Sequence, residues 1–134
     1  MVNKFVVDTV EAPAPTLGNT LHSWHRVSIS YNNINATFID KHVAQKDKFY
    51  WTYDIISVDE IKPVLNYIFT KLGTGPKSNK FVVNSWTVDR GFVTKNCYVG
   101  ADIEIKVVAS WNGVPQLVSL EIVWVQIEGK RTIT

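Results

Sequence analysis

The chain has 134 residues, of which 46% are hydrophobic and 19% are charged, so an intrinsically disordered chain is excluded. The single cysteine excludes an internal disulfide. The formal net charge is +2 and the longest basic run is Lys130-Arg131, which argues against nucleic acid as the main ligand. We expect one domain over residues 1–134.

No apolar run approaches the roughly 18 residues of a membrane span. The apolar stretch near the N-terminus is too short and too acidic for a signal peptide. We therefore expect no membrane partner, and a location in a reducing cytoplasm or in a particle assembled there. The first elements in chain order are a short strand at 3–7 and a Pro-rich segment at 11–19. Proline makes that segment stiff and non-helical, so it links the strand to the body or reaches to a neighbour.

Alternating apolar and polar residues predict strands through much of the remaining chain. Residues 27–31 form one such strand, and asparagines at 32–35 form a turn that leads to a return strand at 36–39. Residues 49–54 alternate again and are read as a separate strand. A further pair is expected at 80–88 and 92–99, joined by a turn at Asp89-Arg90-Gly91.

The pattern at 57–72 predicts a helix between these strands. Ser57 and Glu60 have the spacing of a capping box, and Gly73 is placed to end the helix. Pro63 would remove one helical hydrogen bond, so we expect a 3₁₀ start or a helix that begins near Pro63.

The C-terminal third carries the strongest hairpin signal. Residues 103–110 alternate, and Asn112-Gly113 suits a tight turn with positive φ values. The returning strand at 117–127 is apolar on both faces, which indicates burial on two sides or packing against a partner subunit. The predicted fold is mainly β: an antiparallel β-sandwich or incomplete barrel with one flanking α-helix.

Catalytic and metal-binding chemistry is weakly supported. His22 and His25, with Asp40 and His42 downstream, suggest a metal site. However, two histidines three positions apart point to the same side only in a helix, and this stretch is predicted to enter a strand. We favour the interpretation that these four are ordinary polar residues near the end of a strand. A small enzyme using His22, His25 or Asp54 remains a less favoured alternative.

Two other features have simpler readings than catalysis. Cys97 lies within a predicted strand, away from any helix N-terminus that would lower its pKa, so we expect a buried, inert thiol rather than a nucleophile. Asp54, Asp59 and Glu60 cluster in sequence, but helix capping accounts for Glu60. We expect no enzyme and no cofactor.

The five tryptophans offer another alternative, a carbohydrate-binding β-sandwich module in which exposed indole rings form a platform. We favour packing of these rings in the core or at subunit contacts, since Trp supplies a large apolar area. The residues concerned are Trp24, Trp51, Trp86, Trp111 and Trp124.

The order of these signals is itself informative. After the Pro-rich entry come an Arg-containing strand at 24–27, a Lys-rich strand at 46–51, the capped helix, a Tyr-Val-Gly stretch within 97–100 and a closing strand at 124–128. This order resembles that of small tail proteins of long-tailed bacteriophages of Gram-positive hosts, and of the wider tail-tube and tail-tip module, over about residues 13–128.

The resemblance implies a structural protein of the virion, located in the phage tail (tube or baseplate) and assembled in the bacterial cytoplasm. It implies a ring-forming homo-oligomer whose partners are itself and other tail proteins, with sheets joined edge to edge and no small-molecule ligand. Two segments could reach a neighbouring subunit, namely the Pro-rich segment and the loop at residues 73–79. Combined with these segments and the strand that is apolar on both faces, the resemblance predicts a subunit interface at Pro13, Pro15, Leu17, Gly75, Lys77, Leu117, Val123 and Val125.

Overall fold

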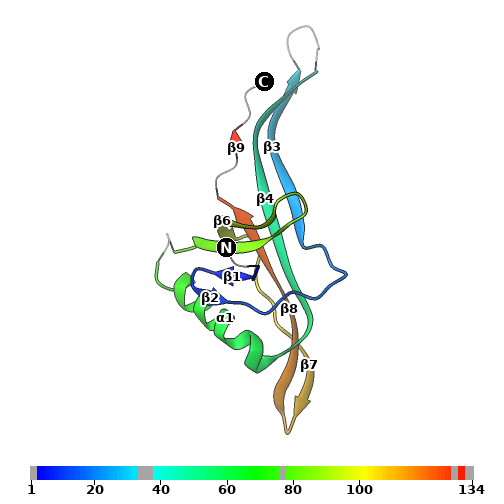
Figure 1. Cartoon of the computed structure of the whole chain (residues 1–134), viewed down its shortest axis with the longest axis vertical. Coiled ribbons are helices and arrows are strands. Elements are labelled where there is room, and N and C mark those ends of the chain that lie inside the picture. The colour runs from blue at the N-terminus through cyan, green and yellow to red at the C-terminus, as the bar shows by residue number, and fades with distance from the viewer. Residues whose placement is uncertain (1–2, 33–37, 76–77, 128–129, 132–134) are drawn as a thin grey trace.

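The structure is a computed structural model that describes residues 3–32, 38–75, 78–127 and 130–131. In this part of the chain the strands form one antiparallel sheet that does not close into a barrel, and one helix packs on it (Figure 1). The predicted mainly β fold with one flanking helix is therefore confirmed. The order across the sheet is β2 (Val10–Glu11), β1 (Val6–Val7), β5 (Phe81–Thr87), β6 (Gly91–Val99), β8 (Val114–Gln126), β4 (Phe38–Ser57) and β3 (His22–Asn32), while β7 (Lys106–Trp111) pairs with β8 and β9 (Lys130–Arg131) pairs with β4.

The predicted hairpins β5–β6 and β7–β8 are confirmed, although β7 begins at Lys106 rather than at residue 103. β3 and β4 also pair, and the turn expected between them falls largely outside the described residues. The prediction of separate strands at 36–39 and 49–54 is wrong, because residues 38–39 and 49–54 both belong to β4, while residues 36–37 lie outside the described part. No glycine or proline interrupts the sequence from Phe38 to Ser57, so nothing local ends the strand.

The helix α1 (Val58–Leu72) begins at its predicted cap. The Ser57 hydroxyl accepts a hydrogen bond from the Glu60 amide at 3.2 Å, as a capping box requires. The expected 3₁₀ start, or a start near Pro63, is wrong: Pro63 lies inside the α-helix. Its ring is exposed, so the carbonyl that lacks a donor because of Pro63 lies on the side of the helix that faces water, and the opposite face of the helix stays buried. Within the described residues no helix has the length and hydropathy to cross a bilayer.

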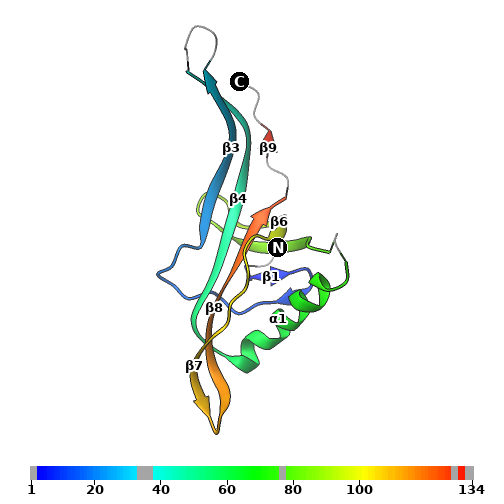
Figure 2. The same ribbon diagram turned by 180° about the vertical axis from the view of Figure 1, so that it is seen from behind.

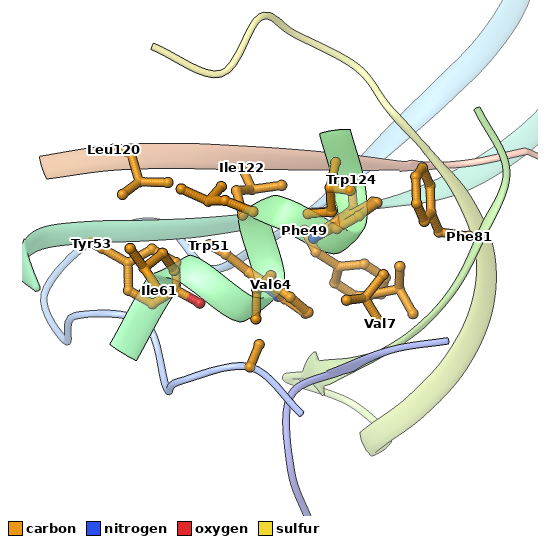
Figure 3. Packing of buried hydrophobic residues seen from close by; sticks show 14 of the residues in the cluster. Val7, Phe49, Trp51, Tyr53, Ile61, Val64, Phe81, Leu120, Ile122 and Trp124 are labelled. Atoms are coloured by element: carbon orange, nitrogen blue, oxygen red, sulfur yellow. The ribbon is translucent and has the colours of Figure 1, made fainter. Parts of the chain in front are cut away.

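The core lies between α1 and one face of β4 and β8 (Figure 3). Alternate residues of β4 point into it, and the register sets each of them opposite an apolar residue of β8. The Trp51 and Trp124 rings meet edge to face at 5.5 Å, and the Trp51 indole N–H donates to the buried Ser85 hydroxyl at 3.0 Å. The paired core residues of the two strands are Phe49 with Trp124, Trp51 with Ile122, and Tyr53 with Leu120.

The N-terminal hairpin is fastened to this core by Asp8, which lies in the β1–β2 turn at a φ of 54°. Its carboxylate accepts hydrogen bonds from the Tyr67 hydroxyl, from Lys71 Nζ at 2.8 Å and from the Val82 amide at 2.8 Å. Burial acts to raise the pKa of Asp8, but these hydrogen bonds outweigh it and hold the pKa below its usual value. The hydrogen bond to Asp8 raises the pKa of Tyr67 to about 12.

The second face of β8 is covered by its own chain at Val123 and Val125. The Gly100 amide donates to the Val123 carbonyl at 2.9 Å, and Val123 and Val125 are each only 8% exposed. A Cβ at Gly100 would lie 2.5 Å from Val125 Cγ2, so the close approach depends on glycine. The sequence suggested that a second copy would cover this face, and at Val123 and Val125 the same chain covers it.

The molecule is elongated, with a two-stranded ribbon at each end. β3 and the first half of β4 extend beyond the core as an arm, which we define as residues 22–32 and 38–47 (Figure 1). β7 and the start of β8 extend from the opposite end as a projecting hairpin, defined as residues 105–116 (Figure 2). Figure 2 also shows from behind that α1 lies beside the middle of the sheet and reaches neither tip.

We predict that Gly100→Ala lowers the free energy of unfolding by about 1–3 kcal/mol, because the added methyl group forces Val125 or the backbone to move. Gly75→Ala is the matched control, since nothing lies within 4 Å of its added Cβ. Urea unfolding followed by circular dichroism measures both variants. Equal stability of the two variants would contradict the tight packing at Gly100.

Candidate functional site

The projecting hairpin is exposed on both faces. Every residue of β7 is exposed, including Val107 at 50% and Trp111 at 72%. Ile105, Val108 and Val114 are also exposed. An isolated two-stranded ribbon is at best marginally stable in water, and contiguous exposed apolar residues mark interaction sites. This ribbon therefore has the composition of a contact surface.

The turn of the hairpin is set by its sequence. Asn112 and Gly113 adopt φ values of 51° and 76°, as the Asn-Gly pair predicts. The register then places Trp111 opposite Val114 at the tip. A large indole ring and a branched side chain are thereby held side by side at the end of the ribbon, facing solvent.

The hairpin also offers an open strand edge. In the part of the chain that the structure describes, β7 pairs with β8 alone, so its other edge has unpaired backbone N–H and C=O groups. β3 likewise pairs with β4 alone and ends the sheet on its side. Open edges pair readily with strands of other chains unless charge, twist or cover prevents it.

An ionic cluster around the buried Asp47 fixes the arm at the other end of the molecule. Asp47 is the last arm residue before β4 starts to pair with β8 at Lys48. Its carboxylate lies 2.9 Å from His22 Nε2, and Arg90 Nη2 donates to both of its oxygens at 2.9 Å. The Asp47 amide donates to Gln126 Oε1 at 3.0 Å, so four segments of the chain meet at this residue.

The electrostatics of Asp47 follow from these contacts. Burial acts to raise its pKa, but the hydrogen bonds and charges of His22 and Arg90 outweigh burial and lower the pKa. The His22 ring also stacks on Phe49 with centroids 5.6 Å apart. Because both carboxylate oxygens already accept hydrogen bonds, the cluster is suited to orienting the arm rather than to taking a proton from a ligand.

Of the residues considered for catalysis or metal binding, the structure describes the side chains of His22 and Asp54, which have different partners, while those of His25, Asp40 and His42 lie outside the described part. His22 pairs with Asp47, whereas Asp54 accepts a hydrogen bond from Asn19 at 3.2 Å on the exposed surface. Among the described residues, no group of three or more His, Cys, Asp or Glu is placed to hold a metal ion. Cys97 is buried, as predicted, and burial raises the pKa of its thiol to about 12.

The predicted interface residues differ in their exposure. Leu17 is 93% exposed and Gly75 is also exposed, whereas Val123 and Val125 are buried. The Pro-rich segment packs against the chain, since the Tyr53 hydroxyl donates to the Pro13 carbonyl at 2.7 Å. Pro13, Pro15 and Leu117 are half-buried, and Lys77 lies outside the described residues.

The alternation at residues 103–110 predicts one strand of a hairpin, but it does not predict that the apolar residues of β7 are exposed on both faces. The signal that could have found them is the run Val107-Val108-Ala109, in which apolar residues fall on both faces of a strand that lacks the large core side chains of β4 and β8. Asp47 and Arg90 are 43 residues apart, and no local pattern joins them.

The tryptophans divide into two groups. Trp51 and Trp124 are fully buried in the core, whereas Trp24, Trp86 and Trp111 are exposed. The exposed rings belong to β3, β5 and β7, which are not neighbours in the sheet. This arrangement gives little support to a shared planar platform for a sugar.

Comparisons of the chain with models of known protein families, with curated proteins and with solved structures found no match.

We predict that Asp47→Asn lowers the free energy of unfolding by about 2 kcal/mol, because charge-assisted hydrogen bonds to His22 and Arg90 are lost. The pKa of Asp47 is depressed in the folded chain, so its contribution is present above the ordinary aspartate pKa of about 4 and is lost as pH falls below it. The fall in stability below pH 4 should therefore be shallower in the variant.

Asp89→Asn is the control for this experiment. Asp89 also pairs with Arg90, at 3.2 Å, but it is exposed, so its replacement should change stability by less than about 0.5 kcal/mol. Thermal unfolding between pH 3 and pH 7 measures all three proteins. Equal losses at Asp47 and Asp89 would contradict the role of Asp47 as the fixed point of the arm.

Proposed function

We propose that the chain is a structural subunit that assembles with copies of itself, and that the assembly is the tail of a long-tailed bacteriophage, in its tube or its baseplate. The observation that carries the proposal is the projecting hairpin, which exposes apolar side chains on both faces and leaves the edge of β7 unpaired. Assembly acts through contacts between sheets and loops, without catalysis and without a cofactor.

Burying the exposed apolar side chains of the projecting hairpin would lower the free energy of the protein in water. Full burial of one large apolar side chain contributes roughly 1.5–3 kcal/mol, and Trp111 is 72% exposed in the single chain. Aromatic side chains at the centre of a contact commonly supply most of its affinity. A second copy of the chain also offers a strand edge at β3, which the backbone of β7 can extend.

The assignment to a phage tail rests on the resemblance in the order of sequence signals, and the elongated shape is consistent with it. A ring needs a heterologous contact, in which two different surfaces of the same chain meet. The arm and the projecting hairpin are two such surfaces at opposite ends (Figure 1). We accordingly place the protein in the virion, with itself and other tail proteins as partners.

Carbohydrate binding is the alternative that the exposed Trp111 also permits. That function requires indole fluorescence to change with an added oligosaccharide and not with protein concentration. The separation of the exposed tryptophans on β3, β5 and β7 favours it less than self-assembly.

We predict that the wild-type chain associates as its concentration rises, and that Trp111→Ser weakens this association by about tenfold or more, since the indole is the largest exposed apolar group of the hairpin. Sedimentation velocity over a concentration series measures the effect. The melting temperature should not change, because Trp111 contributes little to the core.

Val88→Ser is the matched control, since Val88 is 63% exposed but lies at the β5–β6 turn, away from the hairpin. It should associate like the wild type. A wild-type chain that stays monomeric at millimolar concentration would overturn self-assembly. If both variants weakened the association equally, the hairpin would not be a specific part of the contact.

A further inference from the structure

The two ends of the molecule carry opposite charge. The projecting-hairpin end comprises residues 101–121 together with the start of α1, residues 58–62, and acidic residues outnumber basic ones there. Glu104 is exposed, and Asp102 is exposed beside it. Neither side chain makes a hydrogen bond or ion pair to the rest of the described chain, so both charges are available to a partner. The anions are Asp59, Glu60, Asp102, Glu104 and Glu121, against the cations Lys62 and Lys106.

The arm end has the opposite balance. Strand register places Arg26, Gln45 and Lys130 in one row across β3, β4 and β9, with Lys46 and Arg131 in the rows beside it. One of the two anions of the arm, Asp47, is already paired with Arg90. The cations of the arm and β9 are Arg26, Lys41, Lys46, Lys130 and Arg131, against the anions Asp40 and Asp47.

We propose that copies of this chain associate head to tail, with the acidic projecting-hairpin end of one copy, where Asp102 and Glu104 lie at the base of the hairpin, against the basic arm of the next. The inference rests on the proposed self-assembly and specifies its geometry. Complementary charge orients and accelerates such an encounter, while like charges placed together oppose it. A symmetric contact between two projecting-hairpin ends would set Asp102 and Glu104 of one copy against the same acidic residues of the other.

The open edges agree with this direction. β7 at one end and β3 at the other each lack a second strand partner among the described residues. Pairing of β7 with β3 of the next copy satisfies the backbone groups of both edges and places a neighbouring strand beside the apolar side chains of β7. Because the two surfaces differ, the contact is heterologous, and its repetition gives a ring or a filament.

Charge reversal at each end tests the proposal with the full-length chain. The hairpin variant carries Asp102→Lys and Glu104→Lys, which makes both ends basic. The arm variant carries Lys41→Glu and Lys46→Glu, which makes both ends acidic. A second arm variant, Lys130→Glu with Arg131→Glu, repeats the arm test without any change in β4.

We expect each variant alone to associate at least about tenfold more weakly than the wild type, and an equimolar mixture of a hairpin variant and an arm variant to regain wild-type association. Sedimentation velocity at low ionic strength measures both effects. Raising the salt concentration should weaken the wild-type association, since screening shortens the reach of surface charges. Melting temperatures equal to that of the wild type show that each variant is folded.

The outcomes separate this inference from the function on which it rests. Loss of association in the hairpin variant alone, with both arm variants unaffected, would overturn the head-to-tail contact in favour of a symmetric one while self-assembly stands. Mixtures of folded variants that fail to associate would also overturn it. A wild-type chain that does not associate at all would overturn both proposals.

Discussion

The length of two strands governs this structure. β4 has 20 residues and β8 has 13, which correspond to about 65 Å and about 43 Å of extended chain. The helix that covers them has 15 residues and spans only about 22 Å. Core packing therefore covers the middle of the sheet alone, and each long strand must leave it. β4 leaves at one end as part of the arm, and β8 leaves at the other as part of the projecting hairpin.

Different interactions stabilise the parts inside and outside the core. In the middle, apolar residues of β4 and β8 alternate in register beneath α1, and Gly100 closes the opposite face of β8. At the root of the arm, a buried carboxylate joins β3, β4 and the β5–β6 turn. Beyond these points only strand pairing remains, and the projecting hairpin exposes apolar groups to water. Covering those groups with another copy is the simplest way to lower their free energy.

Local features of the fold could be predicted from the sequence. The Asn112-Gly113 turn, the Ser57 cap and the alternation at Phe49, Trp51 and Tyr53 each depend on residues a few positions apart, and the structure has all three. The single β4 strand was missed because the regular alternation fades between residues 40 and 48, where no breaker marks an end.

The candidate site was harder to predict because it depends on distant parts of the chain. The apolar residues of β7 look like those of a buried strand, and only the limited reach of α1 leaves them exposed. Val123 and Val125 look as if they need a partner, but the chain at Gly100 approaches them closely and they are buried. The contact of Asp47 with Arg90 likewise joins segments that no local pattern relates.

Hydrogen–deuterium exchange at increasing protein concentration tests the central claim most directly. The amides of residues 106–111 should exchange rapidly in dilute solution and become protected as the concentration rises. The amides of residues 118–125, which lie in the core, serve as an internal reference and should stay protected throughout. Rapid exchange of residues 106–111 at every concentration would contradict the claim that a second copy covers this hairpin.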